Sequence, residues 1–182
     1  AQLGSVALAA GNAVTLDIAG DKLLNVHVTQ GAVNALVENG GMLRADGGQV
    51  LMTTQTAASL LSNAVNNTGV VQAQTLQNID GTIKLLGGMD TGTMAVGGKL
   101  DASAPNGGKG GFIETSAAQV HVAPSVQVTT AAANGASGTW LIDPQDFVIG
   151  SAPGNNIDGG TLSNTLVTTS VTINTATATG AG

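Results

Sequence analysis

Apolar residues alternate with polar residues in short runs along most of the chain, and the runs begin at or near a glycine. Alternation with a period of two places the apolar side chains on one face of a β-strand. One series of such runs recurs at intervals of 28, 29 and 26 residues, and a second interleaves with it. The first occupies residues 41–46, 69–74, 98–103 and 124–129, and the second 48–52, 81–85, 111–115 and 138–142. This pattern predicts a stacked coil of parallel strands, because the chain returns to the same place in each repeat.

The repeat also predicts which side chains stack inside the coil. In register, the apolar residues of the first series form two columns whose members lie about 4.8 Å apart. The first column is Leu43, Val71, Leu100 and Val126, and the second is Ala45, Ala73, Ala102 and Val128. A single coil cannot bury its inner face alone, so each end needs a cap or further chain. Neither Ala1 nor the segment 175–182 has the composition of a polar cap.

Helical insertions are predicted at three places in this coil. Residues 31–39 and 56–65 space their apolar side chains as a helix does. Residues 158–167 follow a loop and are expected to form a short helix with Asp158 or Thr161 as its N-cap. Period and composition both shift near residue 150, so we expect a change of coil geometry there within one β-helical module spanning residues 1–182.

Composition narrows the classes of partner. The chain has 182 residues with 27 Gly, 2% aromatic residues and a formal charge of −6. Its five Lys and Arg residues are scattered, which argues against nucleic acid because phosphate binding needs clustered cations. No apolar run approaches the roughly 20 residues of a membrane span, so we expect no membrane insertion. The absence of Cys excludes disulfides and thiolate metal sites.

Candidate catalytic and metal-binding residues are few. Asp46, Asp101 and Glu114 could align by stacking, but their equivalents in neighbouring coils are not acidic, so we interpret them as part of a solvated strand face. Asp143 and Asp146 flank a proline and indicate a turn or cap; whether they hold calcium stays open. His27 and His121 stand alone. The sequence therefore predicts no catalytic, cofactor-binding or metal residue and no cofactor.

Trp140 is the only tryptophan, and it lies on a predicted strand of the second series. We interpret it as a plug that fills the core where the coil changes shape. The alternative is a platform on which a sugar ring stacks.

Several longer motifs resemble those of the filamentous-haemagglutinin-like exoproteins of two-partner secretion. They occur in the family's order as GSVALAAG (4–11), LVENGG (36–41), VNNTGV (65–70), GGFIETS (110–116) and GTWLIDPQDF (138–147). The resemblance implies a right-handed parallel β-helix, export through an outer-membrane β-barrel transporter, and a role in adhesion, aggregation or matrix building. The export domain that opens such proteins is not evident. We therefore expect a fragment of a longer solenoid, with the transporter recognised by regions outside it.

Three functional hypotheses follow. The first is a non-enzymatic, rod-like structural module of a secreted bacterial adhesin or extracellular matrix protein, located outside the cell or on its surface and binding host or bacterial glycans or proteins. The second is a subunit of an extracellular filament or sheath, assembled end to end or side by side through unpaired strand edges. The third is a carbohydrate-active β-helix enzyme.

Overall fold

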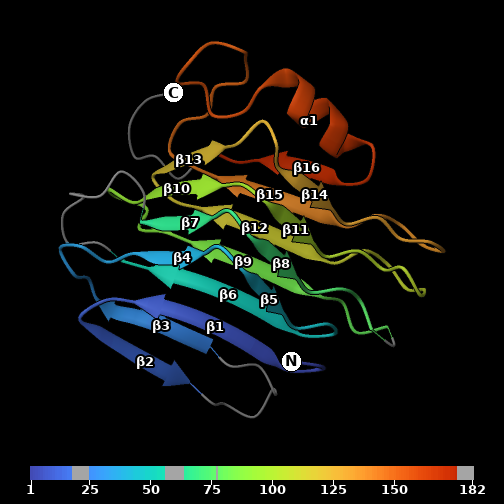
Figure 1. The fold of residues 1–182 in the computed structure, drawn as a ribbon, viewed down its shortest axis with the longest axis horizontal. Coiled ribbons are helices and arrows are strands. Elements are labelled where there is room, and N and C mark those ends of the chain that lie inside the picture. The colour runs from blue at the N-terminus through green and yellow to red at the C-terminus, as the bar shows by residue number, and fades with distance from the viewer. Residues whose placement is uncertain (18–24, 56–63, 77, 176–182) are drawn as a thin grey trace.

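The computed structural model describes residues 1–17, 25–55, 64–76 and 78–175, and it is a parallel β-solenoid of about four turns. Strands account for 48% of the described residues and helix for 5%, which confirms the all-β class predicted from the repeat. Each turn contributes three short strands, and strands of successive turns pair in parallel (Figure 1). The axis of the solenoid therefore runs across the strands.

The four coils lie between residues 37 and 143, and each contains three strands in the same order. The first coil has β4 (Val37–Asn39), β5 (Met42–Arg44) and β6 (Gln49–Thr54), and the second has β7 (Val65–Asn67), β8 (Val70–Gln72) and β9 (Thr82–Leu86). The third has β10 (Thr93–Val96), β11 (Lys99–Asp101) and β12 (Phe112–Ser116), and the fourth has β13 (Gln119–Val122), β14 (Gln127–Thr129) and β15 (Thr139–Asp143).

These strands build three parallel sheets. Sheet 1 has the order β1-β6-β9-β12-β15-β16, in which β1 (Ser5–Ala10) precedes the coils and β16 (Ser170–Ile173) follows them. Sheet 2 is β14-β11-β8-β5, and sheet 3 is β13-β10-β7-β4. The sequence repeat predicts two strands per coil. The structure adds sheet 3, whose strands span only three or four residues and so carry too little alternation to be recognised.

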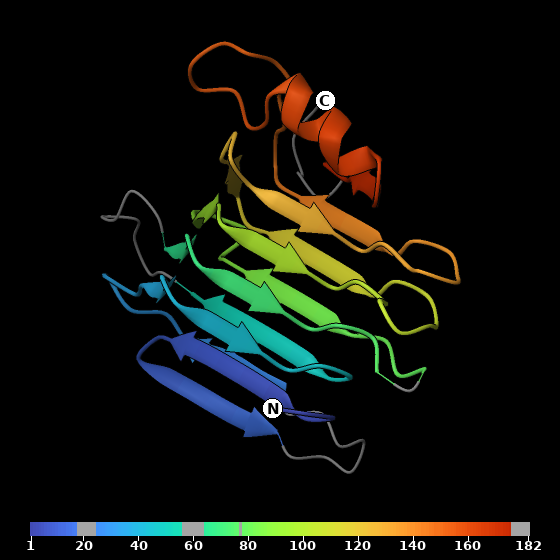
Figure 2. The same cartoon turned by 45° about the vertical axis from the view of Figure 1, so that its right-hand side comes forward.

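An antiparallel hairpin lies outside the stack of coils. It consists of β2 (Ala13–Asp17) and β3 (Asn25–Gln30), and it is the one antiparallel sheet among the described strands. β3 packs against β1 and β6 of sheet 1. β2 lies beyond β1 at the first-coil end of the molecule (Figures 1 and 2). The hairpin therefore extends past the end of the solenoid.

The predicted register of the second series is correct. Val50, Ile83, Ile113 and Trp140 lie in one inward column of sheet 1. The first series is correct for Leu43, Val71 and Leu100 but wrong for the fourth coil, where Val128 and not Val126 pairs with Leu100.

A longer corner causes this error. The corner from Val96 to Lys99 corresponds to the corner from Val122 to Gln127, which is two residues longer. The extra residues form a turn at Pro124 and Ser125. The second predicted column shifts in the same way. Ala45, Ala73 and Ala102 are all fully buried. The fourth position is occupied by the buried Thr130 and not by Val128, because Thr130 follows Thr129, which pairs with Asp101.

The three predicted helical insertions have different outcomes. Residues 159–166 form the helix α1 (Gly159–Leu166), and Asp158 is its N-cap, accepting a 2.9 Å hydrogen bond from the Thr161 amide. Residues 31–39 are not helical: they form a turn and then β4. The apolar spacing there arises because the buried Val37 begins a strand. Most of the predicted insertion at 56–65 falls outside the described residues, although Val65 begins β7.

The core fills the space between the three sheets and consists mainly of Val, Leu, Ile, Met and Ala. Trp140 is its largest fully buried side chain. It pairs with Ile113 on one side and Val171 on the other, and its indole N–H donates a 3.0 Å hydrogen bond to the Thr115 hydroxyl. A buried indole needs such an acceptor. The structure therefore places Trp140 inside the coil, away from any surface on which a sugar could stack.

A pair of buried asparagines supports the corner between sheets 3 and 2. The Asn39 amide donates to the Asn67 side-chain oxygen at 2.8 Å, and the Asn67 amide donates to the Gly97 carbonyl at 2.8 Å. The coils approach closely here: a Cβ atom on Gly98, whose φ is +60°, would lie 2.0 Å from the Gly69 carbonyl oxygen. Glycine and asparagine thus let three successive coils turn in the same place.

The last coil is covered by polar segments before residue 175. Asn156 donates to the Val120 carbonyl at 2.7 Å and its own carbonyl accepts from the Val122 amide, so it covers the edge of β13. The Thr169 hydroxyl accepts from the Thr130 amide at 3.0 Å, and α1 packs against β14. The cap of the solenoid is therefore formed by residues 148–169, a role that the sequence did not indicate.

Replacing Leu100 with Asp tests the inward column. Leu100 is fully buried between Val71 and Val128, so a carboxylate there lowers the free energy of unfolding by several kcal/mol. Gln127→Asp is the control, because Gln127 is exposed and its neighbour Lys99 offers a counter-charge. Denaturant unfolding followed by circular dichroism measures both. Equal shifts for the two variants contradict the facing of β11.

Replacing Asn67 with Ala tests the asparagine pair. The substitution removes the Asn67 donor from the Gly97 carbonyl and leaves the Asn39 amide with only its longer 3.3 Å bond to the Val70 carbonyl, which costs on the order of 2 kcal/mol. Asn66→Ala removes a more exposed hydrogen bond to Glu38, and we expect it to cost under about 1 kcal/mol. The midpoints of thermal unfolding of the two variants are compared with that of the unmodified protein. If Asn66→Ala lowers the midpoint as much as Asn67→Ala, the stabilising role of the asparagine pair is contradicted.

Candidate binding surface

The outer face of sheet 2 carries a continuous set of polar side chains, which we name the polar ladder. The register places Arg44, Gln72 and Asp101 in one outward column. Asp46, Gln74 and Ser103 follow two residues later on the same face, and Lys99 lies two residues before Asp101. The polar ladder is thus Arg44, Asp46, Gln72, Gln74, Lys99, Asp101 and Ser103.

Hydrogen bonds link the polar ladder from coil to coil. The Gln72 amide donates to Asp46 at 2.9 Å, and the Gln74 amide donates to Asp101 and to the Ser103 hydroxyl, each at 3.2 Å. Ser103 in turn donates to Asp101 at 2.6 Å. Each glutamine therefore connects the second coil to an acidic residue of an adjacent coil. These hydrogen bonds hold the side chains in fixed positions.

Each acidic residue of the polar ladder also has a cationic partner in its own coil. The Arg44 guanidinium lies 2.6 Å from Asp46, and the Lys99 ammonium lies 2.9 Å from Asp101. The cationic side chains are 57% and 40% exposed, whereas the carboxylates are 8% and 6% exposed. A molecule approaching this face therefore meets cationic and amide groups first.

The pKa values of both carboxyl groups lie below their ordinary range. Burial raises the pKa of Asp46, but hydrogen bonds from Gln72, Arg44 and Gln74 and the charge of Arg44 outweigh it. Burial likewise raises the pKa of Asp101, and the hydrogen bonds from Ser103 and Lys99 and the Lys99 charge lower it further than burial raises it. Both groups are therefore ionised at neutral pH.

The interpretation of Asp46, Asp101 and Glu114 as a solvated face is wrong for two of them. Asp46 is 5% and Asp101 4% exposed, because side chains of adjacent coils cover them. Glu114 lies on the outer face of sheet 1 and pairs with Lys84 at 3.3 Å. The register separates the three, as predicted: Asp101 pairs with Thr129 and Glu114 with Lys84, so no acidic row forms.

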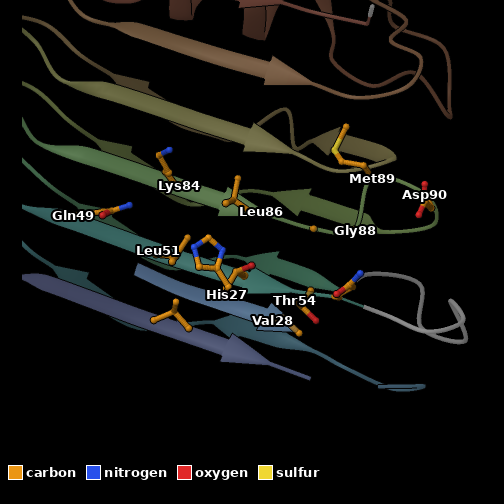
Figure 3. A pocket seen from close by; sticks show the side chains of 14 residues that line it. His27, Val28, Gln49, Leu51, Thr54, Lys84, Leu86, Gly88, Met89 and Asp90 are labelled. Carbon is orange, nitrogen blue, oxygen red and sulfur yellow. The ribbon is translucent and has the colours of Figure 1, made fainter. Parts of the chain in front are cut away.

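A groove lies between the hairpin and the outer face of sheet 1, with a volume of about 450 Å³. β3 forms one wall through Val26, His27 and Val28. Leu51 and Leu86 form an apolar floor between polar groups (Figure 3). The other polar and corner residues around it are Gln49, Thr53, Thr54, Gln55, Lys84, Gly87, Gly88, Met89 and Asp90. A smaller groove of about 340 Å³ separates β14 from α1 and includes Lys99 and Asn164.

The remaining residues singled out by sequence lie apart from the polar ladder. His27 is exposed in the groove, and His121 is half-buried on β13. Asp143 is half-buried at the end of β15, and Asp146 is exposed after it. No group of three or more His, Asp or Glu residues close enough to hold a metal ion occurs in the described part of the chain.

Two features of this surface were not predicted from the sequence. The first is the pair of links made by Gln72 and Gln74. The sequence does carry a signal for them, because two glutamines spaced two residues apart on a strand lie on the same face. The groove depends on a hairpin that folds back on sheet 1, and no local pattern predicts that contact.

Comparison with protein families, curated proteins and solved structures gave no match. Among the described residues, no helix has the length and apolar character needed to cross a membrane.

Acidification tests the two lowered carboxyl pKa values. A carboxyl group with a lowered folded pKa stabilises the fold above its unfolded pKa of about 4, and this stability is lost as the pH falls through the folded value. We expect the free energy of unfolding to fall steeply below about pH 4. Asp101→Asn loses about 1–3 kcal/mol at pH 7 and shows a flatter decline.

The control for this experiment is Asp90→Asn, since Asp90 is exposed at a corner. Urea unfolding at several pH values measures all three proteins. An acid transition that is equally steep in Asp101→Asn and in the unmodified protein contradicts the role of Asp101.

Proposed function

We propose that the chain is a rod-like structural module of a secreted bacterial adhesin or extracellular matrix protein, and that it binds extended polymers through the polar ladder. The observation that carries this proposal is the fixed spacing of that surface. Parallel pairing sets successive side chains about 4.8 Å apart along the axis, and hydrogen bonds hold them there.

The chemistry of the polar ladder suits polar ligands bound weakly at many points. Arg44 and Lys99 offer exposed donors, and Gln72 and Gln74 offer both donors and acceptors. Such groups match the hydroxyl and carboxylate groups of glycans and the backbone of extended peptides. One contact contributes little, but a polymer that meets several coils gains from multivalency.

The acidic residues support a binding role over catalysis. Asp46 and Asp101, the two in the polar ladder, are bound to cations and amides, and lowered pKa values keep them charged. A general acid needs a carboxyl with a raised pKa close to a second catalytic carboxylate. A carbohydrate-active enzyme therefore remains the less favoured alternative.

Secretion is part of the proposal and follows from the family resemblance. The motifs at 4–11, 36–41, 65–70, 110–116 and 138–147 all fall in the β-solenoid, which is the fold expected for filamentous-haemagglutinin-like exoproteins. Under this proposal an outer-membrane β-barrel transporter exports the protein, using regions beyond this chain. The protein then acts outside the cell or on its surface.

A binding screen tests the proposed function. Purified protein is titrated with neutral and acidic polysaccharides of increasing length, with calcium present, by isothermal titration calorimetry. We expect affinity to rise at least about tenfold from short oligosaccharides to long polymers. Replacing Gln72 and Gln74 with Ala weakens binding. Replacing Thr93 and Gln119, neighbours on sheet 3, with Ala is the matched control.

Product analysis separates binding from catalysis. The same mixtures are assayed for new reducing ends and unsaturated sugars, and we expect none. Turnover that disappears in Asp101→Asn, while the fold is retained, overturns the adhesin proposal in favour of the enzyme. Binding that is equal in the ladder variant and the sheet 3 control removes the polar ladder from the proposal.

A further inference from the structure

Asparagine is followed directly by glycine at three places in the sequence, and the structure puts these Asn-Gly steps in two kinds of environment. They are Asn39-Gly40, Asn106-Gly107 and Asn134-Gly135. Asn39 is the last residue of β4 and is only 5% exposed, whereas Asn106 and Asn134 are exposed in corners between sheets 2 and 1. The same dipeptide therefore occurs both inside the stack of coils and on its surface.

The two exposed steps lie at equivalent positions of neighbouring coils. A parallel bridge between Ala104 and Ala132 sets the register of their corners, and Asn106 and Asn134 each lie in a turn two residues further on. The corners protrude side by side at the right-hand edge of the solenoid in both views (Figures 1 and 2). We name residues 104–110 and 132–138 the paired corners.

The groups around the two exposed asparagines are free to move. Neither the Asn106 nor the Asn134 side chain makes a hydrogen bond within the described part of the structure. The Gly135 amide likewise has no partner among the described residues, and the Gly107 amide reaches only the Ala104 carbonyl, at 3.5 Å. Rotation of either asparagine side chain towards the following backbone nitrogen therefore breaks no side-chain hydrogen bond.

Asn39 is held in place by hydrogen bonds from several directions. Its side-chain amide donates to the Asn67 side-chain oxygen at 2.8 Å and to the Val70 carbonyl at 3.3 Å. Its side-chain oxygen accepts from the Gly41 amide at 3.1 Å, and its backbone carbonyl accepts from two amides of the second coil, each at 3.0 Å. The coil must therefore open locally before the Asn39 side chain can turn towards the next nitrogen.

An Asn-Gly step has an intrinsic reaction that needs no enzyme. The glycine nitrogen, after losing its proton, attacks the side-chain carbonyl carbon of asparagine and closes a succinimide ring, because glycine has no side chain to block the close approach. The bond from that carbon to the amide nitrogen breaks, and the amide leaves with a proton as ammonia. Water then opens the ring at either carbonyl, which gives aspartate or isoaspartate.

We propose that Asn106 and Asn134 are sites of spontaneous deamidation in the folded protein, and that the fold protects Asn39. The paired corners leave both the attacking nitrogen and the side-chain carbonyl free, whereas the stack of coils fixes them at Asn39. This inference is independent of the proposed function, because the polar ladder contains none of the three asparagines.

Deamidation changes the charge of the paired corners and leaves the core unchanged. Each conversion adds one negative charge to a chain whose formal charge is −6. Lys109 is the only cationic residue in the paired corners, and it already pairs with Asp80 at 2.9 Å. The new carboxylates therefore lie without a cation of their own at equivalent positions of neighbouring coils. The protein becomes a mixture of charge forms that share one fold.

Peptide mapping by mass spectrometry tests the proposal. The folded protein is incubated in mildly alkaline buffer, and samples taken over time are digested; each converted peptide gains about 1 Da. We expect Asn106 and Asn134 to convert at least about tenfold faster than Asn39, because only Asn39 has to wait for local opening. Both aspartate and isoaspartate form, and the rates rise with pH because the attacking nitrogen must lose its proton.

The unfolded protein is the matched control. In guanidinium chloride all three steps lose their surroundings, and we expect their rates to agree within about threefold. Among folded variants, Asn67→Ala removes an acceptor of the Asn39 amide and speeds conversion at Asn39 at least about threefold, whereas Asn66→Ala does not. Circular dichroism checks that both variants are folded.

The double variant Asn106→Gln, Asn134→Gln connects the reaction to charge. Isoelectric focusing of the incubated unmodified protein shows new acidic bands, and we expect them to be absent in the variant because glutamine forms the corresponding ring far more slowly. The midpoint of thermal unfolding of the unmodified protein stays the same after incubation.

Several outcomes overturn the proposal. One is conversion of Asn39 in the folded protein as fast as that of Asn106 and Asn134. Another is conversion of Asn106 and Asn134 at least about tenfold slower in the folded than in the unfolded protein, which shows that the corners are closed to the reaction. Aspartate without isoaspartate also contradicts it, since direct hydrolysis then replaces ring closure.

Discussion

The backbone hydrogen bonds between successive coils are the interaction on which the rest of the structure depends. They fix the register, and the register alone decides which side chains enter the core and which form the polar ladder. Strands of three residues, such as β8, have no stability of their own. They persist because each coil covers its neighbours, so Leu100 in the core and Gln72 on the surface hold their places for the same reason.

The repeat period made much of this fold predictable. Glycine followed by alternation located both strand series, the inward column through Leu43, Val71 and Leu100, and the buried Trp140. The predicted register was wrong where the local pattern did not indicate how many residues a corner contains. The corner before β14 needs two additional residues without a glycine pair, so Val128 and not Val126 continues the column.

The candidate surface was less predictable than the fold. The alternation placed Asp46 and Asp101 correctly on the outer face of the sheet. However, a side chain on the outer face is not necessarily exposed to solvent. Their burial depends on Gln72 and Gln74 of the adjacent coil, and such contacts exist only after coils stack. The hairpin groove and the cap formed by residues 148–169 depend on segments folding back across the sheets, which a periodic signal does not describe.

The geometry of the coil has a mechanical consequence. Leu43 and Val71 are 28 residues apart in the chain but neighbours along the axis, so each coil adds about 4.8 Å of rod. Pulled out straight, the same residues span roughly 90–100 Å. Tension along the axis acts directly on the hydrogen bonds between coils. When one coil unfolds, its residues span about twenty times the length that the folded coil contributes to the rod. A solenoid built this way can lengthen in steps under tension while its remaining coils stay folded.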